Sequence, residues 1–90
     1  MEPDTLAELI ERHIDAGAAY AAQAIAKVSA LILKARLGMN MTQKEFAEHM
    51  NVSQAMVSKW ESGDYDFTLD TAATVCGKLG LTFEVVIENM

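Results

Sequence analysis

Cysteine, proline and aromatic residues are scarce in this sequence of 90 residues. The single cysteine, Cys76, excludes a framework of intramolecular disulfides and a cysteine-based metal site. Its helical spacing from Ala72, Ala73 and Leu79 predicts a small core residue. The two histidines, His13 and His49, are remote in sequence and have no companion ligands, so we expect no metal site.

Several functional signals are also missing. Residues 1–12 lack the basic start and apolar centre of a signal peptide, and we find no apolar run near the roughly 18–20 residues of a membrane span. There is no Ser/His/Asp or Cys/His grouping, no phosphate-binding glycine loop and no pair of carboxylates in a plausible cleft. We therefore expect a cytoplasmic protein with no membrane partner, no cofactor and no enzymatic activity.

The acidic residues are concentrated at the two ends of the chain. The formal net charge is −6, which opposes binding to an anionic partner such as DNA. Residues 1–20 contain one basic and five acidic residues, and so do residues 64–90, whereas residues 21–63 carry five basic and three acidic residues. Any DNA-binding surface is therefore expected in the middle of the chain, with weak non-specific binding and a steep salt dependence.

The middle of the chain contains signals for two short helices joined by a tight turn. Thr42 and Glu45 have the spacing of a capping box, which predicts a helix beginning near Gln43. Its inward residues would be Phe46, Ala47 and Met50, and Asn51, which tolerates a left-handed backbone, would end it. Ser53 is a suitable N-cap for the second helix.

The second helix has two different sides. At 100° per residue, Val57 and Trp60 share one side, while the other carries small and polar residues: Gln54, Ala55, Ser58 and Lys59. Such a surface fits the major groove, where an amide can bind adenine, a methyl can contact thymine and an ammonium can bind phosphate. The spacing alone fits equally well an ordinary helical hairpin with a solvated face.

The residues of this stretch resemble those of the Cro/C1-type (XRE) helix-turn-helix family of bacterial and phage regulators. The resemblance extends from about Leu31 to Gly80 and rests on these segments: Thr42-Gln43, Phe46-Ala47, Val52-Ser53-Gln54, Val57-Ser58 and Trp60-Glu61-Ser62-Gly63. It implies a mainly α, lambda-repressor-like bundle in which a set of residues faces DNA: Gln43, Lys44, Ser53, Gln54, Ala55, Ser58 and Lys59. Asn51 stands where the family usually has glycine, a departure that its left-handed tolerance accommodates.

Further helices are predicted on both sides of this unit. Pro3 and Asp4 suit the start of an N-terminal arm helix that runs to Gly17, with an apolar stripe of Leu6, Leu9, Ile10, His13 and Ile14. A second helix is expected from Tyr20 to Leu37, closed by Gly38, with its inward residues at Ile25, Val28, Leu31, Ile32 and Ala35. Lys34 and Arg36 in its last turn would lie near a DNA backbone. Ala18, Ala19, Ala21 and Ala22 suit close helix packing, in the core or between two copies.

Beyond Gly63 the sequence predicts a loop, a helix and a strand. Tyr65 and Phe67 would anchor the loop, Thr68 would cap a helix from Leu69 to Leu79, and Gly80 would end it. The inward residues of that helix are expected to be Leu69, Ala72, Ala73, Cys76 and Leu79. From residue 81 the period becomes two, with an apolar side made of Leu81, Phe83, Val85 and Ile87.

This C-terminal strand has no partner strand of similar pattern in the chain. We expect it to pair antiparallel with the same strand of a second copy, so that these four apolar residues form a dimer interface. The alternatives are a frayed tail or pairing with residues 65–67. The resulting organisation is an arm helix over residues 1–19, a DNA-binding domain over residues 20–80 and a dimerisation strand over residues 81–90.

Two functional classes remain open. The first is a homodimeric transcriptional repressor that inserts the helix of residues 53–61 into the major groove of double-stranded DNA at a palindromic operator. The second is an antitoxin that holds a cognate toxin protein with its acidic arm or tail and represses its own operon, since antitoxins of the HigA type share the resembled family.

Overall fold

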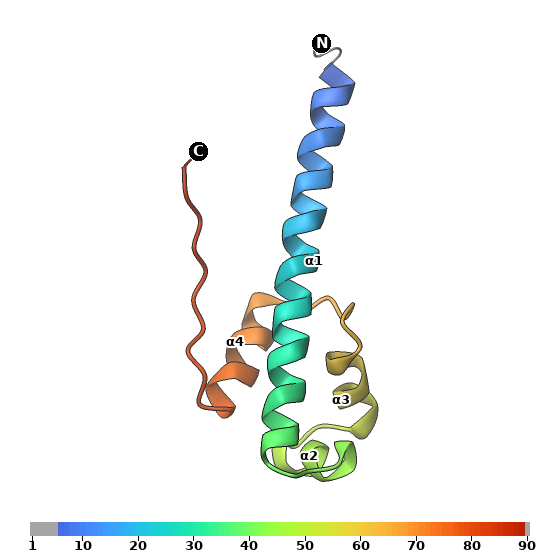
Figure 1. Ribbon diagram of the computed structural model, residues 1–90, viewed down its shortest axis with the longest axis vertical. Helices are drawn as coiled ribbons and strands as arrows, with labels where there is room; N and C mark the ends of the chain where they lie inside the picture. Colours follow the sequence, from blue (N-terminus) through green and yellow to red (C-terminus); the bar gives the residue numbers. More distant parts are fainter. Residues whose placement is uncertain (1–5, 90) are drawn as a thin grey trace.

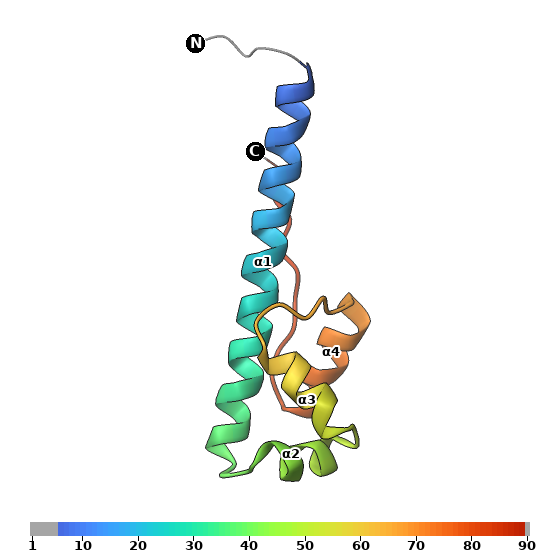
Figure 2. The ribbon, with the colours of Figure 1, turned by 90° about the vertical axis from the view of Figure 1, so that its right-hand side faces the viewer.

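The computed structural model describes the backbone of residues 6–89 and the side chains of residues 16–89. Within this range the chain forms four helices: α1 (Leu6–Gly38), α2 (Gln43–Met50), α3 (Gln54–Glu61) and α4 (Leu69–Lys78). The three short helices gather around the C-terminal half of α1, whose N-terminal half projects away from them (Figure 1). The C-terminal segment then runs back in the direction opposite to α1 (Figures 1 and 2).

The prediction of two separate helices before residue 39 is wrong, because α1 is continuous through Gly17. The helix is kept intact by the alanines on both sides of this glycine, since alanine has the highest helix propensity and a glycine in a helix costs only about 1 kcal/mol. Gly17 does not adopt the positive φ of a helix C-cap. The predicted helix start at Pro3 and the predicted stripe of residues 6–14 lie outside the described residues or side chains.

Three helices end in the same way, at a residue with a left-handed backbone. At the end of α1 this residue is Asn40, at φ 56°, rather than the predicted Gly38, which still belongs to the helix. The amide that follows each left-handed residue bonds to a carbonyl five residues earlier: Met41 N to Arg36 O at 3.3 Å, Val52 N to Ala47 O at 2.9 Å and Leu81 N to Cys76 O at 2.8 Å. The predicted roles of Asn51 and Gly80 are confirmed.

The core lies between the C-terminal half of α1 and the three short helices. The inward residues predicted for the two central helices are confirmed, since all of the following are buried: Phe46, Ala47, Met50, Val57 and Trp60. On α1, Ile32 is fully buried, whereas Ile25, Val28, Leu31 and Ala35 are half-buried. The loop anchors Tyr65 and Phe67 are also half-buried, with their rings in an edge-to-face contact at 4.9 Å.

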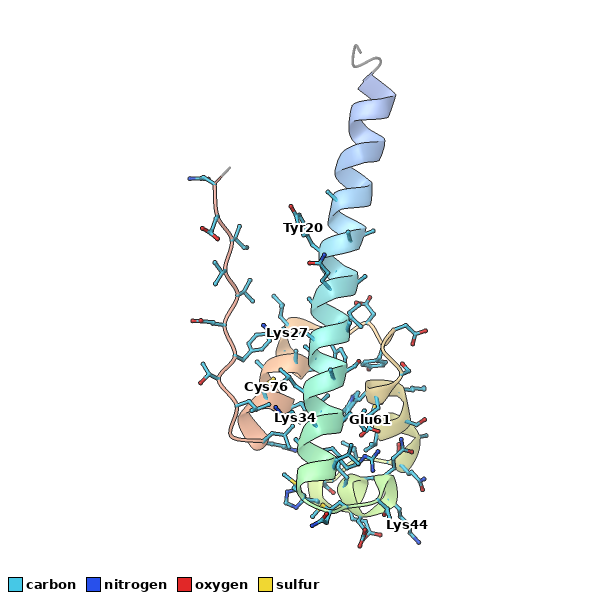
Figure 3. The ribbon with its side chains drawn as sticks, in the orientation of Figure 1. Tyr20, Lys27, Lys34, Lys44, Glu61 and Cys76 are labelled. Atoms are coloured by element: carbon cyan, nitrogen blue, oxygen red, sulfur yellow. The ribbon has the colours of Figure 1, made fainter. Side chains whose placement is uncertain are left out.

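The inward face of α4 differs partly from the predicted one. Ala72 and Cys76 are buried as expected, but Val75 is buried instead of Ala73, and Leu69 is exposed. The side of α4 that faces the core therefore consists of positions 72, 75, 76 and 79, so the helix is rotated about its axis relative to the predicted orientation. Cys76 points from α4 toward α1 (Figure 3).

The C-terminal segment is extended over residues 81–89 but forms no β-ladder with any other described residue. Pairing with residues 65–67 is not observed. Of its predicted apolar side, Leu81 and Phe83 are half-buried, whereas Val85 and Ile87 are exposed. Pairing of this segment with a second chain stays a prediction.

The expectation that no apolar run reaches the length of a membrane span needs correction. Within the 23 residues Ala16–Gly38 of α1, an 18-residue window has a mean hydropathy of 1.4, so this stretch is long and apolar enough to cross a bilayer by length and composition alone. The C-terminal part of this stretch, however, contributes Ile32 to the core and carries Arg36, whose side chain bonds to α3. A membrane insertion of the whole stretch would therefore require the helical bundle to open.

Candidate nucleic-acid interface

The capping box that begins α2 is formed as predicted. The Thr42 hydroxyl accepts from the Glu45 amide at 3.1 Å, and the Glu45 carboxylate accepts from the Thr42 amide at 2.8 Å. The pKa of Glu45 lies below its usual value, because the Thr42 amide donates to the charged form of the carboxylate. Two free amides of the first turn are thus satisfied without any other element.

The turn between α2 and α3 is short and locally determined. Asn51 adopts φ 60° and ψ 46°, and the amide of Val52 closes the end of α2. Ser53 then caps α3, its hydroxyl accepting from the Met56 amide at 3.1 Å. Since both helix ends are set by their own residues, α3 begins in a defined direction relative to α2.

The sidedness of α3 is as predicted. Val57 and Trp60 are buried against α1 and α2, whereas four residues of the opposite side are exposed: Gln54, Ala55, Ser58 and Lys59. This face offers an amide, a methyl, a hydroxyl and an ammonium over two turns of helix. Its side chains, apart from the lysine, are short, which allows the helix axis to approach another surface closely.

The residues predicted to surround this face differ in their exposure and in the hydrogen bonds that they make within the protein. Lys44 is exposed and projects from α2 at the end of the molecule (Figure 3). The Ser53 hydroxyl is engaged as the cap of α3 but remains exposed. Gln43 is half-buried, and its Nε2 donates to Glu61 Oε1 at 3.1 Å. A contact between Gln43 and a nucleic acid would use the oxygen of its amide or the second hydrogen on Nε2.

An ion pair between α1 and α3 was not predicted from the sequence. Arg36 donates to Glu61 through Nε, at 2.7 Å from Oε2, and through Nη2, at 3.1 Å from Oε1. Its Nη1 donates to the carbonyl of Met41 at 3.0 Å. The side chains of Arg36 and Glu61 are only 15% and 7% exposed, and the carboxylate raises the pKa of the guanidinium.

Glu61, at the C-terminal end of α3, is labelled in Figure 3. It joins three helices, since Arg36 comes from α1 and Gln43 from α2. We call this group of Arg36, Gln43 and Glu61 the clamp. Three of the five N–H groups of Arg36 donate within the protein, through Nε, Nη1 and Nη2. The expected position of Arg36 near a DNA backbone stays a prediction. No local pattern could reveal this pair, whose members are 25 positions apart.

Acidic residues limit how strongly this end of the molecule attracts an anion. Lys44 and Lys59 are exposed, but so are Glu45 and Glu48 on α2, and Asp64 and Asp66 in the loop after α3. Asp64 is partly engaged, because Ser62 Oγ donates to its Oδ1 at 2.6 Å. These groups together carry two positive and four negative charges, so any selectivity of this surface must come from shape and hydrogen bonding more than from charge.

Comparison with known protein families gives one match. Residues 32–86, more than half of the chain, match the family described as helix-turn-helix, and this range includes α2, α3 and α4. Neither the comparison with curated proteins nor the comparison with solved structures gives a match.

Proposed function

Because the chain belongs to the Cro/C1-type (XRE) helix-turn-helix family, a family of DNA-binding regulators, we propose that it is a sequence-specific transcriptional repressor. It would bind double-stranded DNA as a homodimer and insert α3 into the major groove of each half of a palindromic operator. Regulation of transcription implies a cytoplasmic location.

The observation that carries this proposal is the combination of an exposed polar face and a fixed helix. Gln54, Ala55, Ser58 and Lys59 are exposed on one side, while the opposite side of α3 is buried and its end is bound by the clamp. A helix that reads bases needs such fixed support, because a displacement of its side chains by about 1 Å is enough to lose a bidentate hydrogen bond. An ordinary helical hairpin with a solvated face would need no such support.

The test begins with selection of bound fragments from random DNA, followed by affinity measurements on the selected operator. Gln54 lies in the first turn of α3, where its amide can bind an adenine edge. We expect Gln54→Ala to relax preference at one base pair of each half-site and to weaken specific binding by about 1–3 kcal/mol.

Lys59→Ala is the matched control on the same face. Its ammonium suits a phosphate, so we expect a similar loss on all sequences and a smaller dependence of the affinity on salt. If Gln54→Ala changed neither the affinity nor the base preference, α3 would not be the reading helix.

The dimer would be formed by antiparallel pairing of residues 81–89 with the same segment of a second copy. The apolar side of this segment is partly exposed in the single chain, and its backbone groups from residue 82 onward make no backbone hydrogen bond with other described residues. Pairing would satisfy these groups and generate a two-fold axis, which is the symmetry that a palindromic operator requires.

An antitoxin is the second candidate, and the observation that favours it is the exposed surface of α1 from Ala16 to Ala24, which the rest of the chain leaves uncovered. In that case a toxin protein encoded beside this gene would co-purify with the chain when the two are expressed together. If the chain binds its operator but no toxin protein co-purifies with it, the chain is a repressor and not an antitoxin.

A further inference from the structure

An apolar groove lies between α1, from Ala24 to Leu31, and the C-terminal segment. It encloses about 550 Å³ and has three walls: Ala24, Val28 and Leu31 on α1, Leu69 and Ala72 on α4, and residues 82–86 of the C-terminal segment. In both ribbon views the C-terminal segment runs along α1 in the opposite direction (Figures 1 and 2).

The groove exposes large apolar side chains that a folded protein normally covers. Leu69, Val85 and Val86, all on its walls, are 68%, 54% and 70% exposed. Because contiguous exposed apolar surface commonly marks an interaction site, we expect a partner to cover this groove.

We infer that the groove is filled by residues 82–89 of a second copy of the chain. This inference rests on the dimer proposed above and specifies where the second strand lies. Each strand would insert between α1 and the C-terminal segment of the other copy, so that the order across the dimer is helix, partner strand, own strand, partner helix. This order has two-fold symmetry and places both strands next to a helix.

The inserted segment has the chemistry that the groove requires. Phe83, Val85 and Ile87 share one side of the extended segment and can pack on the apolar wall of α1. The strand that already borders the groove offers backbone groups without backbone partners, which an antiparallel neighbour would satisfy. The same insertion would cover Leu69, whose exposure is otherwise unusual for a leucine beside the core.

The size of the interface also favours this arrangement. A stable interface uses roughly 20–30 residues from each partner, and residues 81–89 alone fall well short of that number. Addition of the groove walls on α1 and α4 brings each partner close to this range. A two-stranded ribbon without a helix against it is at best marginally stable in water.

The first test is a matched pair of substitutions on α1. Ala24 lines the groove, whereas Ala30 is exposed on another side of the same helix and does not line it. Both side chains are exposed in the single chain, so a glutamate at either site leaves the fold intact. We expect Ala24→Glu to weaken dimerisation at least tenfold in light scattering or sedimentation, and Ala30→Glu to leave it unchanged.

The second test is cross-linking between copies in a Cys76→Ala background, which removes the native thiol. A chain carrying Ala24→Cys is mixed with a chain carrying Val85→Cys, so that any disulfide between these two sites must join two copies. We expect a covalent heterodimer under mild oxidation, and none when Ala30→Cys replaces Ala24→Cys.

Other outcomes would overturn the inference, each in a distinct way. A dimer that is insensitive to Ala24→Glu and forms no cross-link between positions 24 and 85 would have its interface elsewhere, and operator binding would be unaffected. A wild-type chain that is monomeric at micromolar concentration would refute both the groove and the dimer, while Gln54→Ala would still test DNA reading. Co-sedimentation of a monomer with phosphatidylcholine vesicles would assign the apolar face of α1 to a membrane.

Discussion

The clamp leads to a quantitative prediction for Glu61→Ala. The substitution removes an acceptor that receives two hydrogen bonds from Arg36, at 2.7 and 3.1 Å, and one from Gln43, at 3.1 Å. Alanine is a better helix former than glutamate, so α3 itself is not weakened. The cost arises because the Arg36 guanidinium, which is only 15% exposed, loses its counter-charge.

The expected magnitude follows from the environment of Arg36. Removal of one member of a buried ion pair costs about 3–5 kcal/mol. Arg36 keeps its bond to the Met41 carbonyl at 3.0 Å and some access to water, so we expect a smaller loss, about 2–3 kcal/mol. For a domain of this size that corresponds to a decrease in Tm of about 10–20 °C.

Thermal unfolding followed by circular dichroism measures this loss, and a double-mutant cycle assigns it to the pair. The cycle combines Glu61→Ala with Arg36→Ala, and the double variant should be more stable than the sum of the two single losses predicts. Glu48→Ala, which removes an exposed carboxylate from α2, is the control and should change the stability by less than about 0.5 kcal/mol. A Glu61→Ala protein that melts within about 2 °C of wild type, or a coupling free energy near zero, would refute the clamp.

Three further predictions concern the support of the reading helix. Trp60→Ala should remove about 3–5 kcal/mol of a total of about 5–15 and leave the domain nearly unfolded at 37 °C; a melting curve close to wild type would place Trp60 on the surface. Asn51→Ala should cost about 1–2 kcal/mol at this left-handed position and Asn51→Gly much less, so equal melting temperatures would contradict the assigned backbone. The pKa of Glu45 is lowered in the folded chain, so its stabilisation is present above the pKa of the unfolded chain, about 4.3, and is lost as the pH falls through the lower folded value. The difference in Tm between wild type and Glu45→Gln should therefore be constant from about pH 6 to 8 and change below about pH 4, and a difference independent of pH would argue against the capping box.

Local signals in the sequence were sufficient for the helix-turn-helix unit. Thr42 with Glu45, Asn51, and Ser53 each act through hydrogen bonds to residues at most four positions away, and the structure contains all of them. The buried and exposed sides of α2 and α3 also follow from helical periodicity, because each of these helices has a single partner surface. The contact of the exposed residues with DNA remains a prediction.

Local patterns were insufficient where the structure at a residue depends on its wider surroundings. Gly17 was expected to interrupt a helix, but its alanine neighbours continue it. Leu69 was assigned to the core and Val75 was missed, because the side of α4 that is buried depends on the residues of the other helices around Val75 in the core.

The sequence by itself thus determined the caps, the turn and the exposed polar face of α3, since these depend on residues that are close in the chain. Only the tertiary structure decided that Arg36 and Gln43 both donate hydrogen bonds to Glu61, because the three residues meet only after α1, α2 and α3 have packed. It also decided that the C-terminal segment lies along α1 with an apolar groove between them, an arrangement that depends on where α4 ends relative to α1. Short-range hydrogen bonds can be derived from spacing, whereas ion pairs and grooves between distant segments depend on the free energy of the whole packed chain.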